Sequence, residues 1–550
     1  MRRGPWIAAI AVLALGAFEP AVGTRQLQPP LSFDVRSFGA KGDARAVDSD
    51  AINKAILAAA AAGGGFVDLP AGRYLSFSLR LKSHVTLRFS PGAVLIAGDP
   101  ASGLGQYDRA EPNSSDQYQD FGHSHWENSL ISGIDVEDVA IIGPGLIDGR
   151  GLTRAGPGAP WVKGTGGGRP LSMGAAVGGA GDPETALRRM DGLGNKAIAL
   201  KRSRNITLRD FSILNGGHFA LLATGVDNLT IDNLKVDTNR DGFDIDSCRN
   251  VRISNVTVNA PSDDAIVLKS SFALGQARAT ENVTITNCLV SGYDVGSVLD
   301  GTFKRTQERA PDRDGVTGRI KLGTESNGGF RNITISNCVF DRSRGLAIET
   351  VDGGIVEDVT VTNLTMHDVT TAPLFLRIGN RGRGPDGTPV GIMRRIHISD
   401  VVADNIEPRF AASIAGIPGH PVEDVTLSNI RLVYRGGGTT ADAGRGAPEV
   451  EDAYPEPSMF GTLPVYGIFV RHARGVTLRD VTVSTMSPDA RPALLLQDAE
   501  GISLDHVQAS HAGQTPFALL RDVRDVGLRN VTGVADTLLP RVAQGTIVYR

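Results

Sequence analysis

Short stretches of alternating apolar and polar residues recur along most of the chain, and each stretch follows a turn residue. Asn205-Ile-Thr-Leu, Asn228-Leu-Thr-Ile and Asn250-Val-Arg-Ile are three successive copies. The interval between neighbouring copies is about 23 residues where no loop intervenes. Alternation with a period of two predicts β-strands that are buried on one face.

Each copy continues into a second short alternating run, as in Ser254-Asn-Val-Thr-Val, so one repeat unit contains two or more short strands. Such a unit cannot bury its apolar face alone, whereas stacked units cover one another with strands about 4.8 Å apart. The leucine spacing and the helical half of a leucine-rich repeat are missing. The sequence therefore predicts an all-β fold, a parallel β-helix or solenoid.

Asparagine occupies the same turn position in many repeats, often within an Asn-x-Thr sequon, as at Asn205, Asn282 and Asn332. Stacked asparagines can form a ladder of side-chain hydrogen bonds and tolerate left-handed backbone, so the sequons are attributed to the repeat rather than to glycosylation. Cys288 and Cys338 likewise share one repeat position. Three cysteines cannot form a disulfide framework, and we expect buried thiols.

A helix is predicted before the repeats. Asp48 is a candidate N-cap, helical apolar spacing starts at Ala51, and three glycines from Gly63 end the segment. We expect this helix to cover the open N-terminal end of the stack, whose strand edges would otherwise be exposed. The expected organisation is a signal peptide at 1–23, an N-terminal segment with the capping helix at 24–80, and a β-helix at 81–550 with inserted loops at about 154–195 and 303–317.

Residues 1–23 have the features of a secretory signal: Arg2 and Arg3, an apolar stretch from Trp6 to Phe18, and small residues at Ala21 to Gly23. An uncleaved membrane anchor is the alternative, but the apolar stretch is short for a bilayer. We therefore expect a secreted or periplasmic protein.

The charges of the chain nearly balance, with 56 Lys and Arg against 60 Asp and Glu and a formal net charge of -4. No basic stripe exists, which excludes a general attraction to nucleic acid or to an anionic membrane. The glycine-rich segment from Gly164 to Gly168 lacks the Gly-Lys-Ser/Thr and the helix of a phosphate loop, and is interpreted as a surface loop.

Two consecutive repeats carry a dense group of carboxylates, Asn239-Arg-Asp-Gly-Phe-Asp-Ile-Asp246 and Ser262-Asp-Asp-Ala-Ile-Val-Leu-Lys269. Matching their apolar residues gives an offset of 23 positions. This register stacks Asp241 on Asp264, with Asp263 beside the pair. It also places Asp246 against Lys269.

Carboxylates about one strand spacing apart repel one another, so the pKa of at least one should be raised towards the value that a general acid needs. An acid on one side of a glycosidic bond, with a carboxylate-bound water on the other, is the chemistry of glycoside hydrolysis. From composition alone, an outward-facing Asp ladder neutralised by Lys269 or by bound cations is an equal interpretation.

The order of these motifs resembles family 28 of the glycoside hydrolases, the polygalacturonase family of right-handed parallel β-helices. The resemblance rests on Asn239-Arg-Asp241, Asp263-Asp264, the segment Phe33 to Asp43, the capping helix and Gly145-Leu-Ile-Asp-Gly149, and it extends to about Gly354. It implies inverting hydrolysis without cofactor or metal, with Asp263 as general acid. Asp241 and Asp264 would together orient and deprotonate the water.

Two family motifs are changed. The Gly-His-Gly motif falls on Gly318-Arg-Ile320, and the Arg-Ile-Lys motif falls on Ala347-Ile-Glu349, so two cations that hold a galacturonate carboxylate are absent. Glu349 would repel a uronate unless Arg319, Lys321 or Lys269 compensates. We therefore expect altered recognition, such as action on rhamnogalacturonan or release of a terminal sugar.

Aromatic and imidazole side chains supply further candidate sugar contacts. Trp126, in an insertion before a repeat, is expected to stack on a pyranose face, and His218 is a second candidate. His123 and His125 belong to the same group, although a single histidine is more often structural. Glu325 and Asp352 lie near the changed motifs as supplementary acids.

Two other classes of protein stay open. A polysaccharide lyase would hold Ca²⁺ with the acids and use Lys or Arg as the base, which Lys269 permits. A non-catalytic carbohydrate-binding β-helix would explain the changes at Arg319 and Glu349 as lost catalysis, but a binding surface needs no stacked acids. In each case we expect a polysaccharide or oligosaccharide as the partner, no nucleic acid and no membrane, and a monomeric chain.

Overall fold

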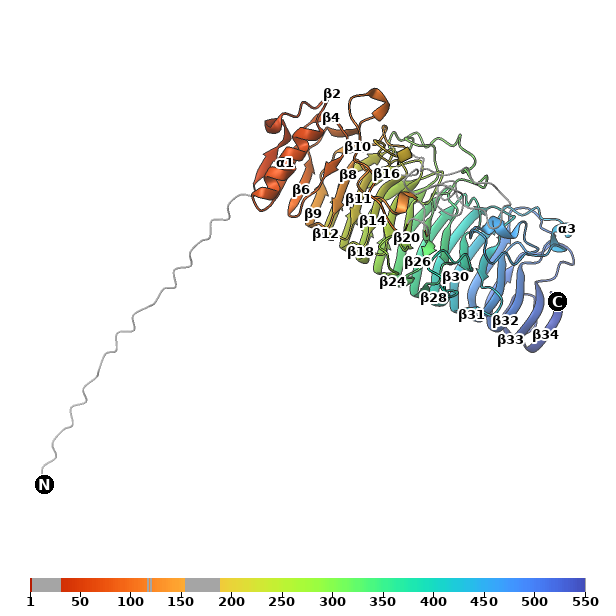
Figure 1. The fold of residues 1–550 in the computed structure, drawn as a ribbon. Helices are drawn as coiled ribbons and strands as arrows, with labels where there is room; N and C mark the ends of the chain where they lie inside the picture. Colours follow the sequence, from red (N-terminus) through yellow and green to blue (C-terminus); the bar gives the residue numbers. More distant parts are fainter. Residues whose placement is uncertain (2–30, 116–117, 119–120, 154–187, 550) are drawn as a thin grey trace.

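The computed structural model describes residues 1, 31–115, 118, 121–153 and 188–549. The predicted signal peptide and most of the predicted loop 154–195 lie outside these residues. The chain winds into a long stack of parallel strands, and Figure 1 shows the coils following one another from the N-terminal to the C-terminal end. The predicted all-β parallel β-helix is confirmed.

Each coil contributes strands to three faces of the stack. The first face contains β5 (Leu79–Arg80), β8 (Ile131–Ile134), β11 (Lys196–Lys201), β14 (Phe219–Thr224), β17 (Asp241–Asp246), β20 (Ile266–Ser270), β23 (Ile320–Ser326), β25 (Leu346–Thr350), β27 (Leu374–Ile378) and β29 (Ala412–Ala415). The second contains β1 (Ser32–Asp34), β3 (Gly65–Leu69), β6 (Val85–Phe89), β9 (Glu137–Ile142), β12 (Arg204–Arg209), β15 (Asp227–Asp232), β18 (Arg249–Ser254) and β21 (Thr280–Thr286).

The third face contains β2 (Asp43–Val47), β4 (Gly72–Ser76), β7 (Ala93–Ala97), β10 (Leu146–Asp148), β13 (Ser212–Leu214), β16 (Lys235–Asp237), β19 (Thr257–Asn259) and β22 (Leu289–Ser291). Longer strands continue these faces to the C-terminal end: β24 (Phe330–Asp341), β26 (Ile355–His367), β28 (Ile392–Ile406), β30 (Val422–Tyr434), β31 (Ile468–Thr485), β32 (Leu494–Ala509), β33 (Ala518–Arg529) and β34 (Thr537–Ile547). The last pair, β33 and β34, is antiparallel.

The asparagine ladder is present at the turn between the first and second faces. Asn228 donates from Nδ2 to Oδ1 of Asn205 at 2.9 Å, and Asn250 donates to Asn228 at 3.1 Å. Their φ angles of 57°, 56° and 56° lie in the left-handed region that asparagine tolerates. Cys288 and Cys338 are buried free thiols, as predicted.

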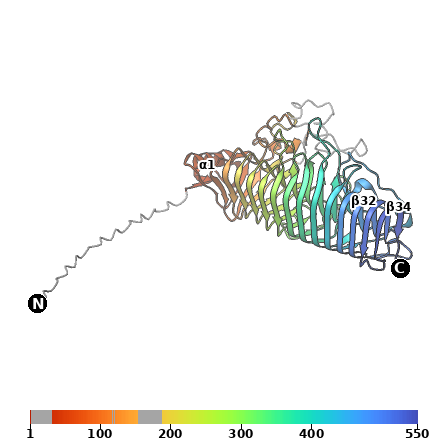
Figure 2. The same cartoon turned by 90° about the horizontal axis from the view of Figure 1, so that it is seen from below.

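The capping helix α1 (Ser49–Ala61) covers the N-terminal end of the stack, with Ile52, Ala55 and Ile56 fully buried (Figures 1 and 2). Asp48 precedes α1, but its carboxylate accepts from the backbone of Lys41 at 2.6 Å rather than from the helix. Strands β1 to β5 already pair within the stack, so the β-helix begins before the predicted boundary at residue 81.

Inserted segments gather on one side of the stack in both views (Figures 1 and 2). Residues 292–319, which include the predicted loop 303–317, connect β22 to β23, and residues 435–467 connect β30 to β31. The segment 435–467 was not predicted. It contains α3 (Thr440–Ala443) and the 3-10 helix η6 (Pro457–Phe460); the other short 3-10 helices are η1 (Val35–Phe38), η2 (Pro100–Ser102) and η4 (Phe121–His123).

Phe460 anchors the segment 435–467 on the first face, where it packs with Phe375 and Phe469 at ring centroid distances of 6.3 and 5.5 Å. Two buried arginines, Arg377 and Arg471, lie over the same ring. Within the described ranges, no helix combines the length and the apolar run that crossing a lipid bilayer requires.

Candidate active site

The predicted pairing of the two acidic repeats is present. In the register of β17 and β20, Phe243 lies opposite Ile266 and Asp246 lies opposite Lys269. Asp241 begins β17, and the turn before β20 carries Asp263 and Asp264. One carboxylate oxygen from each of these three aspartates lies within 4.8 Å of the others.

Gly242 lets the two coils approach closely at this point. Its backbone N–H donates to the carbonyl oxygen of Asp264 at 3.0 Å. A Cβ at Gly242 would collide with the carbonyl oxygen of Ala265 and with the side chain of Val258. The glycine that follows Asp241 therefore brings the three carboxylates together.

The three carboxylates have different environments. Burial, and then the charge of Asp263, raise the pKa of Asp241 well above its usual range. Burial acts in the same direction on Asp264, but Arg319 and Lys321 outweigh it and lower the pKa of Asp264 to about 2. The expected raised pKa thus belongs to Asp241.

Asp263 is the most open of the three, with 26% of its side chain exposed. Arg240 donates to its Oδ2 from Nη2 at 2.6 Å and from Nε at 3.2 Å. Another nitrogen of Arg240 lies 3.3 Å from Nδ1 of His218. His218 is fully buried against Phe219, so it meets the site through Arg240 and the predicted sugar contact is wrong.

Arg319 is buried between two carboxylates. Its Nε lies 2.6 Å from Oδ1 of Asp264, and its Nη1 lies 2.9 Å from Oε2 of Glu456. Arg344 also pairs with Glu456, at 3.3 Å. Glu456 comes from the segment 435–467, so a distant part of the chain completes the site.

Lys321 and Glu349 form a second buried pair, with Nζ and Oε2 separated by 3.4 Å. Lys321 also lies 3.6 Å from Oδ2 of Asp264 and donates to the hydroxyl of Tyr454 at 3.3 Å. Burial raises the pKa of Glu349 to about 7, although Lys321 and Arg319 oppose the shift. Lys321 therefore compensates Glu349, but neither side chain is open to a sugar in this structure.

The ammonium of Lys269 contacts a third group of buried side chains. Its Nζ lies 3.3 Å from Asp244, 3.1 Å from Glu325 and 2.6 Å from Nε2 of His123. Burial disfavours the charge of Lys269, but Asp244, Glu325 and Asp241 outweigh it and raise the pKa of Lys269 well above its usual range. Lys269 therefore holds its proton.

The two supplementary acids are also neutralised by arginines. Glu325 accepts from Nη1 of Arg383 at 3.0 Å, and Asp352 accepts from Nε of Arg381 at 3.0 Å. Both carboxylates are buried. They stabilise the loop after β27 rather than offering a titrating group to a substrate.

The predicted stacking of Trp126 on a sugar is wrong. The indole is fully buried and donates from Nε1 to Oγ1 of Thr224 at 3.1 Å. Nζ of Lys201 lies 3.6 Å from the ring centroid and covers the ring. The insertion folds inward because its aromatic side chain packs against Phe219 and Leu222 of β14.

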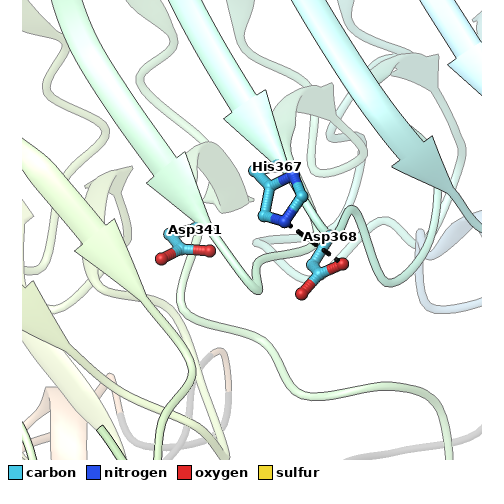
Figure 3. Close-up of side chains that lie close together, drawn as sticks. All are labelled: Asp341, His367 and Asp368. Atoms are coloured by element: carbon cyan, nitrogen blue, oxygen red, sulfur yellow. Dashed lines mark ion pairs between the residues drawn. The ribbon is translucent and has the colours of Figure 1, made fainter.

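A second cluster of potential metal ligands lies where β24 and β26 end, and Figure 3 shows its side chains Asp341, His367 and Asp368. His367 lies 2.7 Å from Asp404 through Nδ1 and 3.6 Å from Asp368 through Nε2. Arg305 pairs with Asp368 at 2.6 Å. Cations of the chain itself therefore balance this cluster, and Arg305 ties the segment 292–319 to it.

A surface cavity of about 630 Å³ lies at the turns between the first and second faces, lined by residues that include Asp135, Arg202, Asp227 and Arg278. The three clustered aspartates lie instead at the turn between the third and first faces. Arg202 and Asp135 in this cavity form an exposed ion pair at 2.7 Å. The cavity is therefore separate from the carboxylate cluster.

Comparison with known proteins agrees with the β-helix fold. Residues 186–306 match a family model described as a right handed beta helix region, and residues 32–121 match one described as rhamnogalacturonase A/epimerase, pectate lyase-like. A probable polygalacturonase of Vitis vinifera is 25% identical over 421 residues, which cover 72% of this chain and 73% of the relative. The chain is therefore similar to a polygalacturonase over most of its length.

Other polygalacturonase relatives support the same conclusion. A polygalacturonase of Cochliobolus carbonum is 25% identical over 328 residues, covering 58% of this chain and 68% of that protein. The exopolygalacturonase of Thermotoga maritima has the same fold, with a TM-score of 0.56 at 17% identity over 95% of this chain and 96% of its own. The family 28 exopolygalacturonase of Yersinia enterocolitica gives a TM-score of 0.52 at 19% identity, over 93% and 79% of the two chains.

Sequence reasoning missed Glu456 and Tyr454. The available signal was the acidic and aromatic run from Glu449 to Glu456, which stands in a long interval between two repeats. A polar segment of this length between stacked coils must lie on the surface of the stack, where it can reach a functional side chain.

Proposed function

We propose that the protein is a glycoside hydrolase that cleaves a pectin-type polysaccharide or its oligosaccharides, with substrate recognition that differs from that of a plain polygalacturonase. The observation that carries this proposal is the cluster of Asp241, Asp263 and Asp264, whose carboxylate oxygens lie within 4.8 Å of one another. The proposal also rests on the polygalacturonase relatives.

In the proposed reaction, Asp263 gives a proton to the glycosidic oxygen while a water attacks the anomeric carbon. Asp241 and Asp264 hold that water, and Asp264, with its pKa of about 2, is ionised at neutral pH and accepts the proton that the water loses. One water is consumed and one glycosidic bond is broken. The residues themselves supply the acid and the base, so the reaction needs no cofactor and no metal.

The spacing of the carboxylates suits one bound water. A water that donates to two carboxylate oxygens at about 2.7 Å spans about 4.5 Å between them. Typical inverting enzymes separate acid and base by about 6.5 to 9.5 Å, and retaining enzymes by about 5 to 5.5 Å. The oxygens of this cluster lie within 4.8 Å of one another, below both ranges, so their spacing does not select inversion. Inversion is proposed from the family resemblance alone, and proton NMR of the first anomer formed tests it directly.

Altered recognition is supported by the charges around the cluster. Arg319, Lys321 and Lys269 pair with carboxylates of the chain itself, so none of them replaces the missing family cations by contacting a uronate. Rhamnogalacturonan, in which uronates alternate with neutral sugars, fits this arrangement.

Action at a chain end is supported by the two segments that cover the first face. Trp126 packs its insertion over β14, and Phe460 packs the segment 435–467 over β27 and β31. A long polysaccharide that ran along this face would meet both segments. We therefore also propose exo-acting release of a terminal sugar, by a secreted or periplasmic monomer.

A lyase mechanism is less well supported. It requires Lys269 to act as a base, but Asp244 and Glu325 keep that ammonium protonated. A purely carbohydrate-binding protein would have no use for three carboxyl groups whose oxygens lie within 4.8 Å of one another. The carboxylate cluster thus favours hydrolysis over both alternatives.

The test is product release from homogalacturonan, rhamnogalacturonan and neutral glycosides by wild type and by Asp263→Asn. Saturated sugars released by wild type and not by the variant, with chelator having no effect, support the hydrolase. Ultraviolet-absorbing products that disappear with chelator would support a lyase. Sugar binding without turnover on any substrate would support a binding protein.

A further inference from the structure

Arg240 is distinguished from the other cations of the carboxylate cluster by its access to solvent. Its side chain is 21% exposed, whereas those of Arg319 and Lys321 are 2% and 1% exposed. Among the described cations that pair with Asp263 or Asp264, Arg240 is therefore the one that an incoming sugar can reach.

Arg240 lies at the exposed edge of the carboxylate cluster. It stands in the turn before β17, between Asn239 and Asp241, and its guanidinium extends over the surface to Asp263. A guanidinium matches the planar geometry of a carboxylate with paired hydrogen bonds. It can exchange one carboxylate for another without losing a charge-assisted bond.

We propose that Arg240 binds the carboxylate of a uronate substrate and in doing so releases Asp263 from its ion pair. This inference rests on the proposed hydrolase function and adds the residue that recognises the uronate. Before substrate binds, Arg240 donates to Oδ2 of Asp263 at 2.6 Å. A substrate carboxylate competes for the guanidinium at the place where the acid is needed.

The groups that face Asp263 determine what happens after the exchange. Asp241 and Asp264 adjoin it on the neighbouring coil and turn, and Tyr454 approaches from the segment 435–467. Once Arg240 has turned away, the carboxyl groups of Asp241 and Asp264 remain as neighbours of Asp263, within 4.8 Å. The proton comes from solvent through the exposed edge of Asp263 and is then available for the glycosidic oxygen.

This arrangement explains how the chain binds a uronate although the cations of the Arg-Ile-Lys motif are absent. A neutral sugar does not displace Arg240, so Asp263 stays in its ion pair and the bond is not cleaved. Arg240 therefore binds the uronate carboxylate and releases Asp263 from its ion pair in the same step. The specificity of the enzyme is then set by Arg240 rather than by the residues at 319 and 349.

The experiment compares trigalacturonate with its methyl ester on wild type, Arg240→Gln and Arg240→Lys, with Arg395→Gln as the control. Arg395 pairs with Asp358 at 2.7 Å on a distant exposed turn. We expect wild type to prefer the free acid by about 100-fold in kcat/KM and Arg240→Gln to lose most of that preference. Arg240→Lys should recover part of it, and the control should match wild type.

The pH profile separates this role from a structural one. Without Arg240, a carboxyl group beside two others holds its proton to higher pH, so the basic limb of kcat/KM for the ester should move upward in Arg240→Gln. The inference would be overturned if Arg240→Gln lost equal amounts of kcat/KM on the free acid and on the ester while its pH profile did not move. It would also be overturned if the variant kept the wild-type preference for the free acid.

Binding distinguishes this inference from the proposed function. Calorimetric titration with trigalacturonate should show weaker binding by Arg240→Gln than by wild type, and equal binding would overturn the inference whatever the turnover. If wild type binds trigalacturonate through Arg240 but releases no product from any substrate, the hydrolase function fails while carboxylate recognition by Arg240 stands.

Discussion

Nε of Arg319 lies 2.6 Å from Oδ1 of Asp264, and the same guanidinium donates to Glu456. These partners are 55 and 137 residues away from Arg319 in the chain. Arg319 therefore links a candidate catalytic carboxylate to the segment 435–467. It keeps Asp264 ionised and holds the segment 435–467 against the site.

This link predicts that Glu456→Gln weakens both folding and catalysis. Arg319 and Arg344 would lose their shared carboxylate in a buried position, where breaking an ion pair costs about 3 to 5 kcal/mol. Urea denaturation should show that loss, and kcat should fall about tenfold because Arg319 is less well positioned. Glu423→Gln, on an exposed pair with Arg474, is the control and should change neither quantity. If Glu456→Gln were as stable as wild type, the result would contradict this link.

Glu349 makes the stability of the fold depend on pH. Its pKa is raised from 4.5 to about 7, so its contribution to stability is fully present below about 4.5 and is lost as the pH rises through 7. Glu349→Gln mimics the protonated form and should not show this loss. Relative to wild type, the variant should gain about 3 kcal/mol in unfolding free energy between pH 4.5 and pH 8.

Urea denaturation of both proteins at the two pH values measures the gain. Glu500→Gln changes a surface carboxylate and should follow the wild-type pH dependence. If the difference in unfolding free energy between wild type and Glu349→Gln is the same at both pH values, Glu349 is ionised throughout this pH range.

Trp126 is expected to matter for folding and not for sugar binding. Trp126→Ala should cost about 3 to 5 kcal/mol because a fully buried indole is lost. Trp126→Phe keeps much of the packing, so its KM should stay within about twofold of wild type. A large rise in KM for the Phe variant, without a loss of stability, would restore the stacking role.

Lys269 separates hydrolysis from lyase chemistry. Lys269→Met removes a cation that pairs with Asp244 and Glu325, so we expect lower stability and a retained ability to release saturated sugars. Thermal unfolding and product analysis of the variant give both results. Loss of unsaturated products in the variant, with wild type forming them, would make Lys269 the base of a lyase.

The repeats could be predicted from the sequence because residues close together in the chain specify each strand. The two-residue period fixes which side chains enter the core, and matching Phe243 with Ile266 fixes the register of the acidic strands. The asparagine ladder follows from the same repetition. The aspartate cluster was therefore predictable residue by residue.

The surroundings of the cluster could not be predicted in the same way. The contact of Glu456 with Arg319 joins an irregular segment to a coil, and no periodic pattern specifies such a contact. Trp126 was expected on the surface because it stands in an insertion, but burying an indole against Phe219 outweighs leaving it in solvent. The stack also begins earlier than predicted, since the short strands from β1 onward alternate only briefly.

We propose that Asp241, Asp263 and Asp264 form a hydrolytic site. The most direct measurement is the release of saturated sugar from pectic oligosaccharides by wild type and Asp263→Asn, with binding of the same oligosaccharides measured in parallel. We expect at least about a 100-fold loss of turnover in the variant, with binding retained. Equal turnover by the two proteins, or an absence of turnover in wild type on every pectic substrate, would contradict it.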